Sequence, residues 1–320
     1  MKTIIYKETD KPRIDKFLAS NLDLSRSKIQ KLIIDEFVVV NDKEVTPHYD
    51  LKEGDVIKIK TETKKNMDVE MAADNIKKEA QDRIKLNIKI IKEDPDYLIV
   101  DKPAGLAVHG AEHMNEVTLI DYLVEKYPDI VGVGDDEKRP GIVHRIDKDV
   151  SGLLVVARNN KIYEHLKSQF KKRTIKKEYE ALVYGATSKD YDTIDFPLRR
   201  STSGYKISAL PKGSEIKDDI REAITLFEVK QRFINYTLLN VIIKTGRTHQ
   251  IRCHLAAYGH PIVGDELYST KKTREKNKKL KLGRIFLCSV RLGFKDLNGE
   301  KVEFKANLPK NLKDVLDKVK

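Results

Sequence analysis

Short apolar runs separated by polar segments recur along the chain and predict its secondary structure. Runs rich in β-branched and aromatic residues predict strands at residues 97–100, 153–157, 179–183 and 236–243. Apolar side chains at helical spacing, Ile162, Leu166 and Phe170, predict one face of a helix. A second helix is predicted to begin after Thr248 as its N-cap and to stop at Gly259. Because these strands and helices do not alternate regularly, we expect an α+β fold and not a series of βαβ units.

The first sixty residues have a pattern of their own. Apolar residues recur at helical spacing around Ile14 and again around Ile29, which predicts two short amphipathic helices, the second with Ser25 as its N-cap. Residues 37–45 then read as a hairpin, and a further strand is predicted at 56–59. These elements predict a small, separate α+β domain.

The domain boundaries follow from the same patterns. Residues 61–86 are polar and charged without a strong apolar period, which indicates a linker. We therefore expect a small domain at 1–60, the linker at 61–86 and a large domain at 87–320. A chain of 320 residues with 40% hydrophobic residues is long enough for two domains.

The chain is basic, with a formal net charge of +12 and a pI near 9.3. This charge suits a polyanionic partner. Lysine and arginine are concentrated in two runs, at residues 161–177 and 271–284. Each run taken alone is also typical of a solvated helix face or loop.

Cysteine content and hydropathy exclude several classes of protein. Cys253 and Cys288 offer neither a disulfide framework nor a metal-ligand pattern. The apolar patch at Ile4 and Ile5 is too short for a secretory signal, and Lys7 follows it closely. No apolar run approaches the roughly 20 residues that a membrane-spanning helix needs. We therefore expect a soluble, cytoplasmic protein.

Residues 144–156, His-Arg-Ile-Asp-Lys-Asp-Val-Ser-Gly-Leu-Leu-Val-Val, carry the most informative chemistry of the chain. A polar turn containing Asp147 leads through Ser151 and Gly152 into an unbroken apolar run, which reads as a buried strand. Asp147 is thereby placed on a loop at the edge of a buried sheet, where catalytic side chains are often held. The alternative is that Asp147 only shapes the turn through Asx hydrogen bonds.

This segment resembles the signature of the RluA/RluD-type pseudouridine synthases, in which the aspartate of a His-Arg-Leu-Asp-x-x-Thr-Ser-Gly-Leu motif is catalytic. Other stretches resemble further motifs of that family in the same order, at residues 91–109, 177–183, 246–255 and 260–265. The first ends in Lys-Pro-Ala-Gly-Leu-Ala-Val-His, the second is Lys-Glu-Tyr-Glu-Ala-Leu-Val, and the third begins Gly-Arg-Thr-His-Gln-Ile-Arg. One short motif carries a real false-positive risk, but several in order identify the chain as similar to this family.

The resemblance implies a pseudouridine synthase fold, with a mixed, largely antiparallel sheet, flanking helices and a central RNA-binding cleft. It implies isomerisation of uridine to pseudouridine, which needs no cofactor. Asp147 would be the ionised carboxylate beside the ribose, acting either as a nucleophile at C1′ or as a base at C2′. Arg252 would form the salt bridge that keeps this carboxylate charged in a water-poor pocket. Tyr179 would stack on the target base and assist deprotonation at C5, although a strand tyrosine is also common in a core.

Four further residues match family positions that bind substrate. Arg145 would fill the space that the flipped base leaves, and unstacking that base costs about a few kcal/mol. Ile251 would pack against the uracil, and Arg247 would bind phosphate. Lys102 would brace the floor of the cleft and is counted with the substrate-binding residues. In such an enzyme the two basic runs are interpreted as phosphate contacts, so binding would depend steeply on salt.

The first sixty residues resemble the S4 RNA-binding module at 13–16 and 25–33. By this resemblance Arg13, together with Arg26, Lys28 and Lys31 of the second helix, would contact RNA. The alternative is that they are ordinary exposed residues of a module that is close to neutral overall.

We expect no metal site. His249 and His254 are five residues apart and share one helix face poorly. His144 and His260 bring no Cys or carboxylate at a recognisable zinc spacing. One departure from the family pattern is Val150, which stands where threonine is usual and removes a hydroxyl from the loop of Asp147.

Two functions of different classes remain open. The first is an RNA pseudouridine synthase acting on large-subunit (23S) ribosomal RNA, or with the same chemistry on tRNA. The second is a non-catalytic RNA-binding or ribosome-assembly protein. The presence together of Asp147, Tyr179 and Arg252 favours the enzyme, because a protein that only binds RNA needs none of them. We expect a monomer with RNA as its partner and no membrane association.

Overall fold

The computed structural model describes residues 2–7, 12–22, 26–34, 36–59, 88–110, 116–201, 206–217 and 219–319. The chain divides into two compact units, Met1–Asp82 and Arg83–Lys320, and each is described by itself. The expected linker at 61–86 lies outside the described residues.

The first unit is a four-stranded antiparallel sheet with two helices. Its elements are β1 Lys2–Ile5, α1 Ile14–Asn21, α2 Arg26–Ile34, β2 Val38–Val40, β3 Lys43–Glu44 and β4 Val56–Ile59. The sheet order is β1-β4-β2-β3. Ile14, Leu18, Ile29 and Ile33 are buried against the sheet, so the predicted helical faces are confirmed. The expected cap Ser25 lies outside the described residues.

The predicted hairpin of the first unit is confirmed, and its turn has a clear cause. Asn41 and Asp42 both have positive φ, 53° and 61°, as a tight two-residue hairpin turn requires. The Asn41 amide also donates a 2.8 Å hydrogen bond to Asp55, which ties this turn to β4. Strand β1 was not predicted, because its apolar run at Ile4 and Ile5 is too short to show a period.

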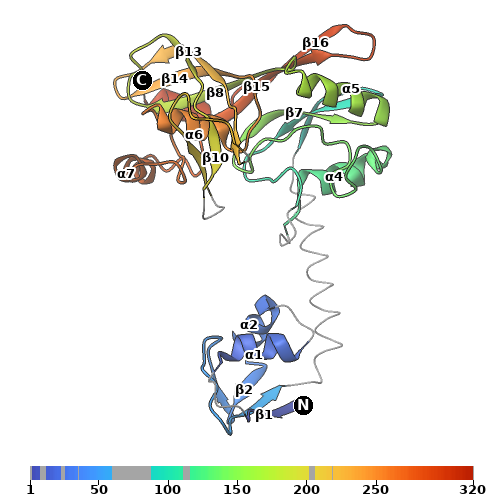
Figure 1. Cartoon of the computed structure of the whole chain (residues 1–320), viewed down its shortest axis with the longest axis vertical. Coiled ribbons are helices and arrows are strands. Elements are labelled where there is room, and N and C mark those ends of the chain that lie inside the picture. The colour runs from blue at the N-terminus through green and yellow to red at the C-terminus, as the bar shows by residue number, and fades with distance from the viewer. Residues whose placement is uncertain are drawn as a thin grey trace. The chain divides into compact units, whose positions relative to one another are not determined.

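The second unit is built on a nine-stranded sheet in the order β5-β6-β7-β15-β8-β14-β13-β9, with β16 paired to β15 (Figure 1). Its strands are β5 Lys89–Glu93, β6 Tyr97–Lys102, β7 Ser151–Ala157, β8 Lys176–Tyr184, β9 Tyr191–Ile194, β13 Thr225–Arg232, β14 Tyr236–Ile243, β15 Leu287–Lys295 and β16 Lys301–Lys305. The pairings among its described strands are antiparallel except that of β7 with β15. The predicted α+β class and the four predicted strands are confirmed.

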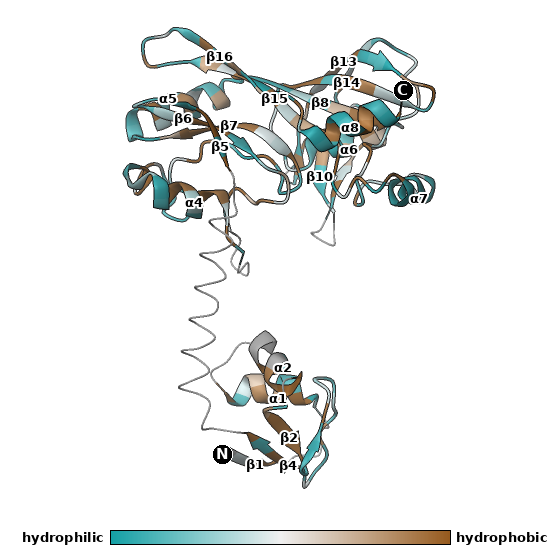
Figure 2. Cartoon of the chain, turned by 180° about the vertical axis from the view of Figure 1, so that it is seen from behind, coloured by the Kyte–Doolittle hydropathy of each residue, from teal (hydrophilic) through white to brown (hydrophobic). Residues whose placement is uncertain are grey.

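Strand β7 is buried along its whole length because both faces of the sheet are covered. Leu153 and Val155 point to the cluster that holds α5, Asn160–Lys171. Leu154 and Val156 point to the opposite cluster, which contains α4, Leu119–Lys126. Figure 2 shows apolar residues concentrated in the inner strands of the sheet. This two-sided burial explains the unbroken apolar run in the sequence.

Helix α4 is followed directly by the short helix η1 Pro128–Ile130. The remaining elements are β10 Leu198–Arg200, β11 Ile207–Ala209, β12 Ile220–Arg221, α6 Gln250–Ala257, α7 Lys271–Leu280 and α8 Lys310–Lys318. Strands β11, β10 and β12 form a separate three-stranded sheet in that order. Helix α7 is polar in Figure 2, whereas α6 is buried along most of its length. None of the described helices is long and apolar enough to cross a membrane.

The start of α6 differs from its prediction. The helix begins at Gln250, and its N-cap is His249, not Thr248. His249 has a left-handed backbone, φ 52° and ψ 21°, and its side chain makes no cap hydrogen bond. Gly259, φ 92°, follows the last turn at Ala257 as expected of a helix stop.

Candidate active site

Backbone hydrogen bonds hold the loop of Asp147 in place. The Gly105 amide donates to the Lys148 carbonyl over 2.8 Å, and the Val150 amide donates to the Asp147 carbonyl over 3.1 Å. Val150 stands where the family usually has threonine, and its side chain is buried in the core. Apolar packing therefore holds this position, where a threonine could use its hydroxyl. These contacts place Asp147 immediately before β7, as predicted, with 23% of its side chain exposed.

Lys102 braces the same loop. Its side chain is fully buried, and Nζ donates hydrogen bonds to the carbonyls of Pro103 (2.9 Å), Leu106 (2.6 Å) and Lys148 (3.0 Å). These three hydrogen bonds tie the ammonium to the backbone, so Lys102 braces the loop. Its assignment to substrate binding stays a prediction.

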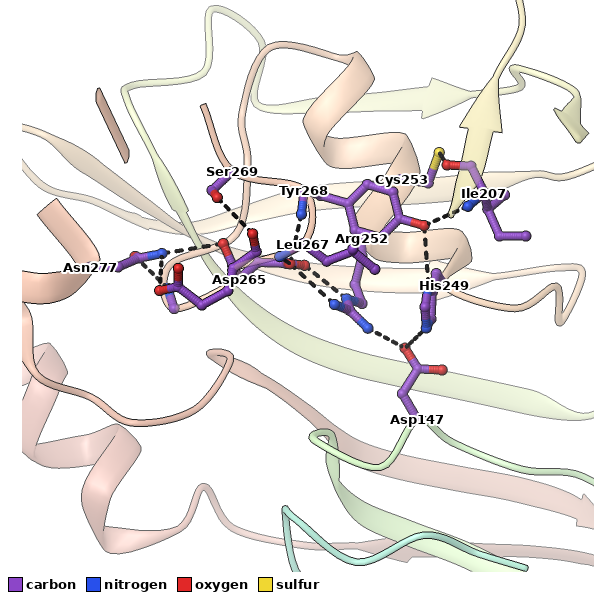
Figure 3. Close-up of polar contacts among 12 residues, drawn as sticks. Asp147, Ile207, His249, Arg252, Cys253, Asp265, Leu267, Tyr268, Ser269 and Asn277 are labelled. Atoms are coloured by element: carbon purple, nitrogen blue, oxygen red, sulfur yellow. Dashed lines mark hydrogen bonds and ion pairs between the residues drawn. The ribbon is translucent and has the colours of Figure 1, made fainter. Parts of the chain in front are cut away.

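Arg252 of α6 joins two carboxylates (Figure 3). One terminal nitrogen donates to Oδ2 of Asp147 over 3.2 Å, while Nε and the other terminal nitrogen donate to the two oxygens of Asp265 over 2.8 and 3.1 Å. Burial alone would lower the pKa of Arg252, but Asp265 and Asp147 more than offset it and raise that pKa. Among the described residues, Oδ1 of Asp147 has no hydrogen-bond partner. One oxygen of this carboxylate is thus held, and the other is open.

Asp265 is a functional residue that the sequence did not reveal. It is almost fully buried, and besides Arg252 its Oδ1 accepts the backbone N–H groups of Leu267 and Tyr268, both at 2.9 Å. The His-Pro-Ile-Val-Gly-Asp stretch at 260–265 resembles a family motif, but nothing in it shows that its aspartate meets an arginine 13 residues earlier. A buried carboxylate with this many donors is a rigid anchor for the guanidinium.

His249 and Tyr268 complete this side of the site (Figure 3). The Tyr268 hydroxyl accepts the Ile207 N–H over 3.0 Å and lies 3.1 Å from Nδ1 of His249. Nε2 of His249 faces Oδ2 of Asp147 at 3.9 Å. Burial lowers the pKa of His249, and the nearby Arg252 acts in the same direction, against Asp147. A neutral imidazole therefore faces the carboxylate at neutral pH.

A cavity of about 530 Å³ opens in front of Asp147. Tyr179 of β8 and Ile251 of α6 both line it, so the structure brings together these two predicted residues and Asp147. Only 5% of Tyr179 is exposed, and burial raises the pKa of its phenol, with a further contribution from Asp147. Tyr179 is therefore protonated at neutral pH.

The same cavity is strongly basic. Its lining contains eight lysines and arginines and, among the described residues, a single carboxylate, that of Asp147. Arg145 and Arg247 are both in this lining. Arg145 is exposed and contacts Nε2 of His109 over 3.2 Å, and Nε of Arg247 donates to the Glu222 carbonyl over 3.1 Å. A cleft with this charge suits a phosphate backbone.

Parts of the first basic run are paired with carboxylates. Lys167 contacts Asp135 at 2.6 Å, Arg173 contacts Glu222, and Lys176 contacts Glu303 at 3.1 Å. The second run forms α7, whose N-terminus is closed by a capping box between Thr270 and Thr273. The interpretation of both runs as phosphate contacts stays a prediction.

The residues predicted to bind RNA in the first unit are placed only in part. Arg13 makes a two-pronged ion pair with Asp15, at 3.1 and 2.9 Å, and Gln30 donates to the same carboxylate over 2.7 Å. This cluster joins α1 to α2, so Arg13 has a structural role. The side chains of Arg26, Lys28 and Lys31 lie outside the described part of the chain.

The histidines considered as metal ligands are used in other ways. His254 is buried between Thr225 Oγ1 and the Phe196 carbonyl, each at 2.9 Å, and His260 contacts the Tyr184 carbonyl at 2.9 Å. Across the described residues, no three His, Cys, Asp or Glu side chains are grouped as metal ligands would be.

Comparisons with known proteins agree with this geometry. The profile of the RNA pseudouridylate synthase family matches residues 96–257, and that of the S4 domain matches 12–57. The uncharacterized RNA pseudouridine synthase YlyB of Bacillus subtilis is 36% identical over 98% of this chain and 96% of its own length. The ribosomal large subunit pseudouridine synthase C of Vibrio parahaemolyticus is 33% identical over 95% of this chain and 91% of its own.

A solved structure gives the same result for the fold. Human RNA pseudouridylate synthase domain containing 1 is 27% identical, with a TM-score of 0.56 over 70% of this chain and 84% of its own. The chain therefore belongs to the RNA pseudouridylate synthase family and is an RNA pseudouridine synthase with an S4 domain at its N-terminal end.

Proposed function

We propose that this enzyme isomerises specific uridines of large-subunit (23S) ribosomal RNA and that Asp147 is its catalytic residue. The proposal is carried by the carboxylate of Asp147, which is held through one oxygen by Arg252 and open through the other to a basic cavity. The choice of RNA is supported by relatives such as the Vibrio enzyme, whose name gives the large ribosomal subunit as its target.

The reaction exchanges one glycosidic bond for another. The N1–C1′ bond breaks, the uracil turns, a C5–C1′ bond forms, and the proton on C5 is lost while N1 gains one. A carboxylate beside the ribose is needed whether it attacks C1′ or removes the proton from C2′. Asp147 offers its open oxygen for either step, and no external group enters the balance.

Arg252 and Asp265 are proposed to keep that carboxylate ionised and correctly aimed. In a cleft shielded by RNA, a carboxylate drifts toward its neutral form unless a cation lies beside it. Arg252 is that cation, and its two bonds to Asp265 fix the guanidinium plane. Asp265 is thus a positioning residue and acts on the reaction through Arg252.

Tyr179, Ile251 and Arg145 are proposed to receive the target nucleotide. A uridine must leave its stack to reach Asp147, and aromatic and apolar side chains are the usual surfaces for a flipped base. The Tyr179 ring and the Ile251 side chain supply such surfaces in the cavity lining, and the exposed Arg145 can fill the space left in the RNA. Because its phenol is protonated, Tyr179 would contribute contact and proton transfer, not negative charge.

We further propose that residues 1–60 contact RNA as the S4 domain, that residues 87–320 form the catalytic domain, and that the protein acts as a cytoplasmic monomer. Light scattering coupled to gel filtration of the RNA-free protein tests the oligomeric state. A mass of twice 36.8 kDa would contradict the monomer.

Mapping pseudouridines in total RNA from cells that lack this gene tests the function. Cells rescued with the wild type should regain specific large-subunit sites, and cells rescued with Asp147→Ala should not. The matched control is Asp149→Asn, which changes a carboxylate of the same loop that does not line the cavity. If the pseudouridines that disappear lie in tRNA instead, the substrate is tRNA and not large-subunit RNA. Full rescue by Asp147→Ala would overturn the catalytic assignment.

A further inference from the structure

Lys177 is a buried lysine in the catalytic cleft. It belongs to β8, two residues before Tyr179, and both side chains line the cavity in front of Asp147. Only 9% of Lys177 is exposed, which is unusual for a lysine.

The described residues around it supply no anion. The ammonium lies over the ring of Phe170, 5.4 Å from the centroid. It also lies against the loop before α6, because a Cβ added to Gly246 would be 3.5 Å from Nζ. Among the described residues, Lys177 has neither an ion pair nor a hydrogen-bond partner for Nζ. The neighbouring Lys176, by contrast, pairs with Glu178 and Glu303, each at 3.1 Å.

An unpaired buried charge disfavours the folded state. Burial lowers the pKa of Lys177 to about 8, and no carboxylate opposes this shift. The nearby His144 stacks on Phe170 with ring centroids 4.7 Å apart, and burial lowers its pKa to about 3, with Lys177 acting in the same direction. At pH 7, Lys177 is therefore the charged member of this group and His144 is neutral.

We propose that Lys177 binds a phosphate group of the RNA strand that occupies this cleft, an inference that rests on the proposed RNA-modifying function. The cavity holds eight Lys and Arg side chains against the single carboxylate of Asp147, so the RNA brings the anion that the free protein lacks. Lys177 suits this role because its side chain is largely buried, lines the cavity and places Nζ between Phe170 and Gly246. A phosphate there would lie on the same face of β8 as Tyr179, next to the target nucleotide.

A purely structural role for Lys177 makes the opposite prediction about stability. If the cation–π contact with Phe170 were its purpose, removing the ammonium would destabilise the free protein. If the Lys177 ammonium serves to bind RNA, its burial without a counter-ion destabilises the free protein. Removing this charge should then make the free protein more stable and weaken its binding to RNA.

Three variants of the full chain separate these cases: Lys177→Met, Lys177→Arg and, as the matched control, Lys176→Met. Methionine keeps most of the side-chain volume against Phe170 and removes only the charge. We expect the Tm of the RNA-free Lys177→Met protein to rise by about 2 °C or more. Lys176→Met removes a paired, exposed lysine from the adjacent position and should shift Tm little.

The RNA measurement uses total RNA from cells lacking the gene, so that every possible substrate is present. In an Asp147→Asn background, Lys177→Met should weaken binding roughly 10- to 100-fold. Its slope of log affinity against log salt should be smaller by about 0.7 to 0.9, the change expected when a protein neutralises one phosphate fewer. Lys177→Arg should restore much of both, and Lys176→Met should change both much less, because Glu178 and Glu303 already neutralise its charge.

Unchanged affinity and salt slope in Lys177→Met would overturn the proposal, as would a loss of affinity without any change in slope, which indicates a contact to a neutral group. A fall in Tm for Lys177→Met with normal RNA binding would assign the residue to the core. If the wild type modifies no large-subunit RNA, the proposed substrate fails, but the comparison of binding by the Lys177 variants still decides this inference.

Discussion

At the residue scale, the site depends on how one buried guanidinium is shared. Arg252 gives two hydrogen bonds to Asp265 and one, the longest at 3.2 Å, to Asp147. A residue that only neutralised Asp147 would not need the second carboxylate. The division of bonds leaves Arg252 fixed in place and leaves Asp147 with an open oxygen and a single charged contact.

Replacing Asp265 should therefore impair catalysis through Arg252. We expect Asp265→Asn to lower kcat at least about 10-fold with little change in KM, because substrate contacts remain while the cation beside Asp147 is misaligned. Asp265→Ala should also reduce the free energy of unfolding by about 3–5 kcal/mol, since it leaves a buried guanidinium half-paired. Single-turnover kinetics and urea unfolding measure the two effects.

The control for this prediction is Asp192→Asn, which changes a carboxylate bound by Tyr258 and Lys189 away from the cavity. It should leave kcat unchanged. If Asp265→Asn raised KM alone, Asp265 would be acting on RNA binding and not on the alignment of Arg252.

At the element scale, the close approach of β7 to β15 determines where the Asp147 loop ends. These two strands form the parallel pair of the sheet, with Gly152 opposite Ser289. Gly152 has φ 113°, and a Cβ at this position would lie 2.1 Å from the Ser289 carbonyl oxygen. The glycine that follows Ser151 is thus required by tertiary contact as well as by backbone conformation.

Gly152→Ala should destabilise the catalytic unit by more than about 3 kcal/mol, because left-handed backbone strain adds to a clash with rigid backbone. Thermal or urea unfolding followed by near-UV circular dichroism measures the loss. Gly299→Ala is the matched control: its φ is also positive, 82°, but nothing lies within 4 Å of an added Cβ. Equal losses for the two variants would show that conformation alone sets the requirement.

At the scale of the whole molecule, the S4 domain and the Asp147 site belong to different units. The first unit has its own core around Ile14, Leu18 and Ile57, and every residue of the Asp147 site lies in the second. Changes in the first unit should alter how tightly RNA is held without altering the chemical step.

The double variant Lys28→Ala, Lys31→Ala should weaken RNA binding and reduce the slope of log affinity against log salt by about 0.7 to 0.9 for each phosphate that is no longer neutralised. Its kcat at saturating RNA should equal that of the wild type. Filter binding over a salt series, with turnover at high RNA concentration, measures both quantities. The matched control changes Lys43 and Lys52, which lie outside the two helices; an equal effect there would mean that only total charge matters.

The sequence predicted those parts of the molecule that follow a local rule. The strands at 97–100 and 236–243 show β-branched or aromatic runs, and α5 shows its apolar spacing within 12 residues. The rule failed where the signal was short or nonlocal. Strands β10, β11 and β12 have two or three residues each, and the N-cap of α6 was misplaced because the left-handed turn at His249 is not visible as a cap signal.

By itself, the sequence determined the α+β class and the place of Asp147 before a buried strand. By resemblance it also predicted that Tyr179 and Arg252 lie in the same site as Asp147. Only the tertiary structure decided that Asp265 anchors Arg252 and that Lys177 is buried with no anionic partner among the described residues. The physical reason is that periodicity and capping act within a few residues, whereas ion pairing and desolvation depend on which distant segments meet. Asp147 and Arg252 are 105 residues apart, and only the folded sheet and α6 bring their charges within 3.2 Å.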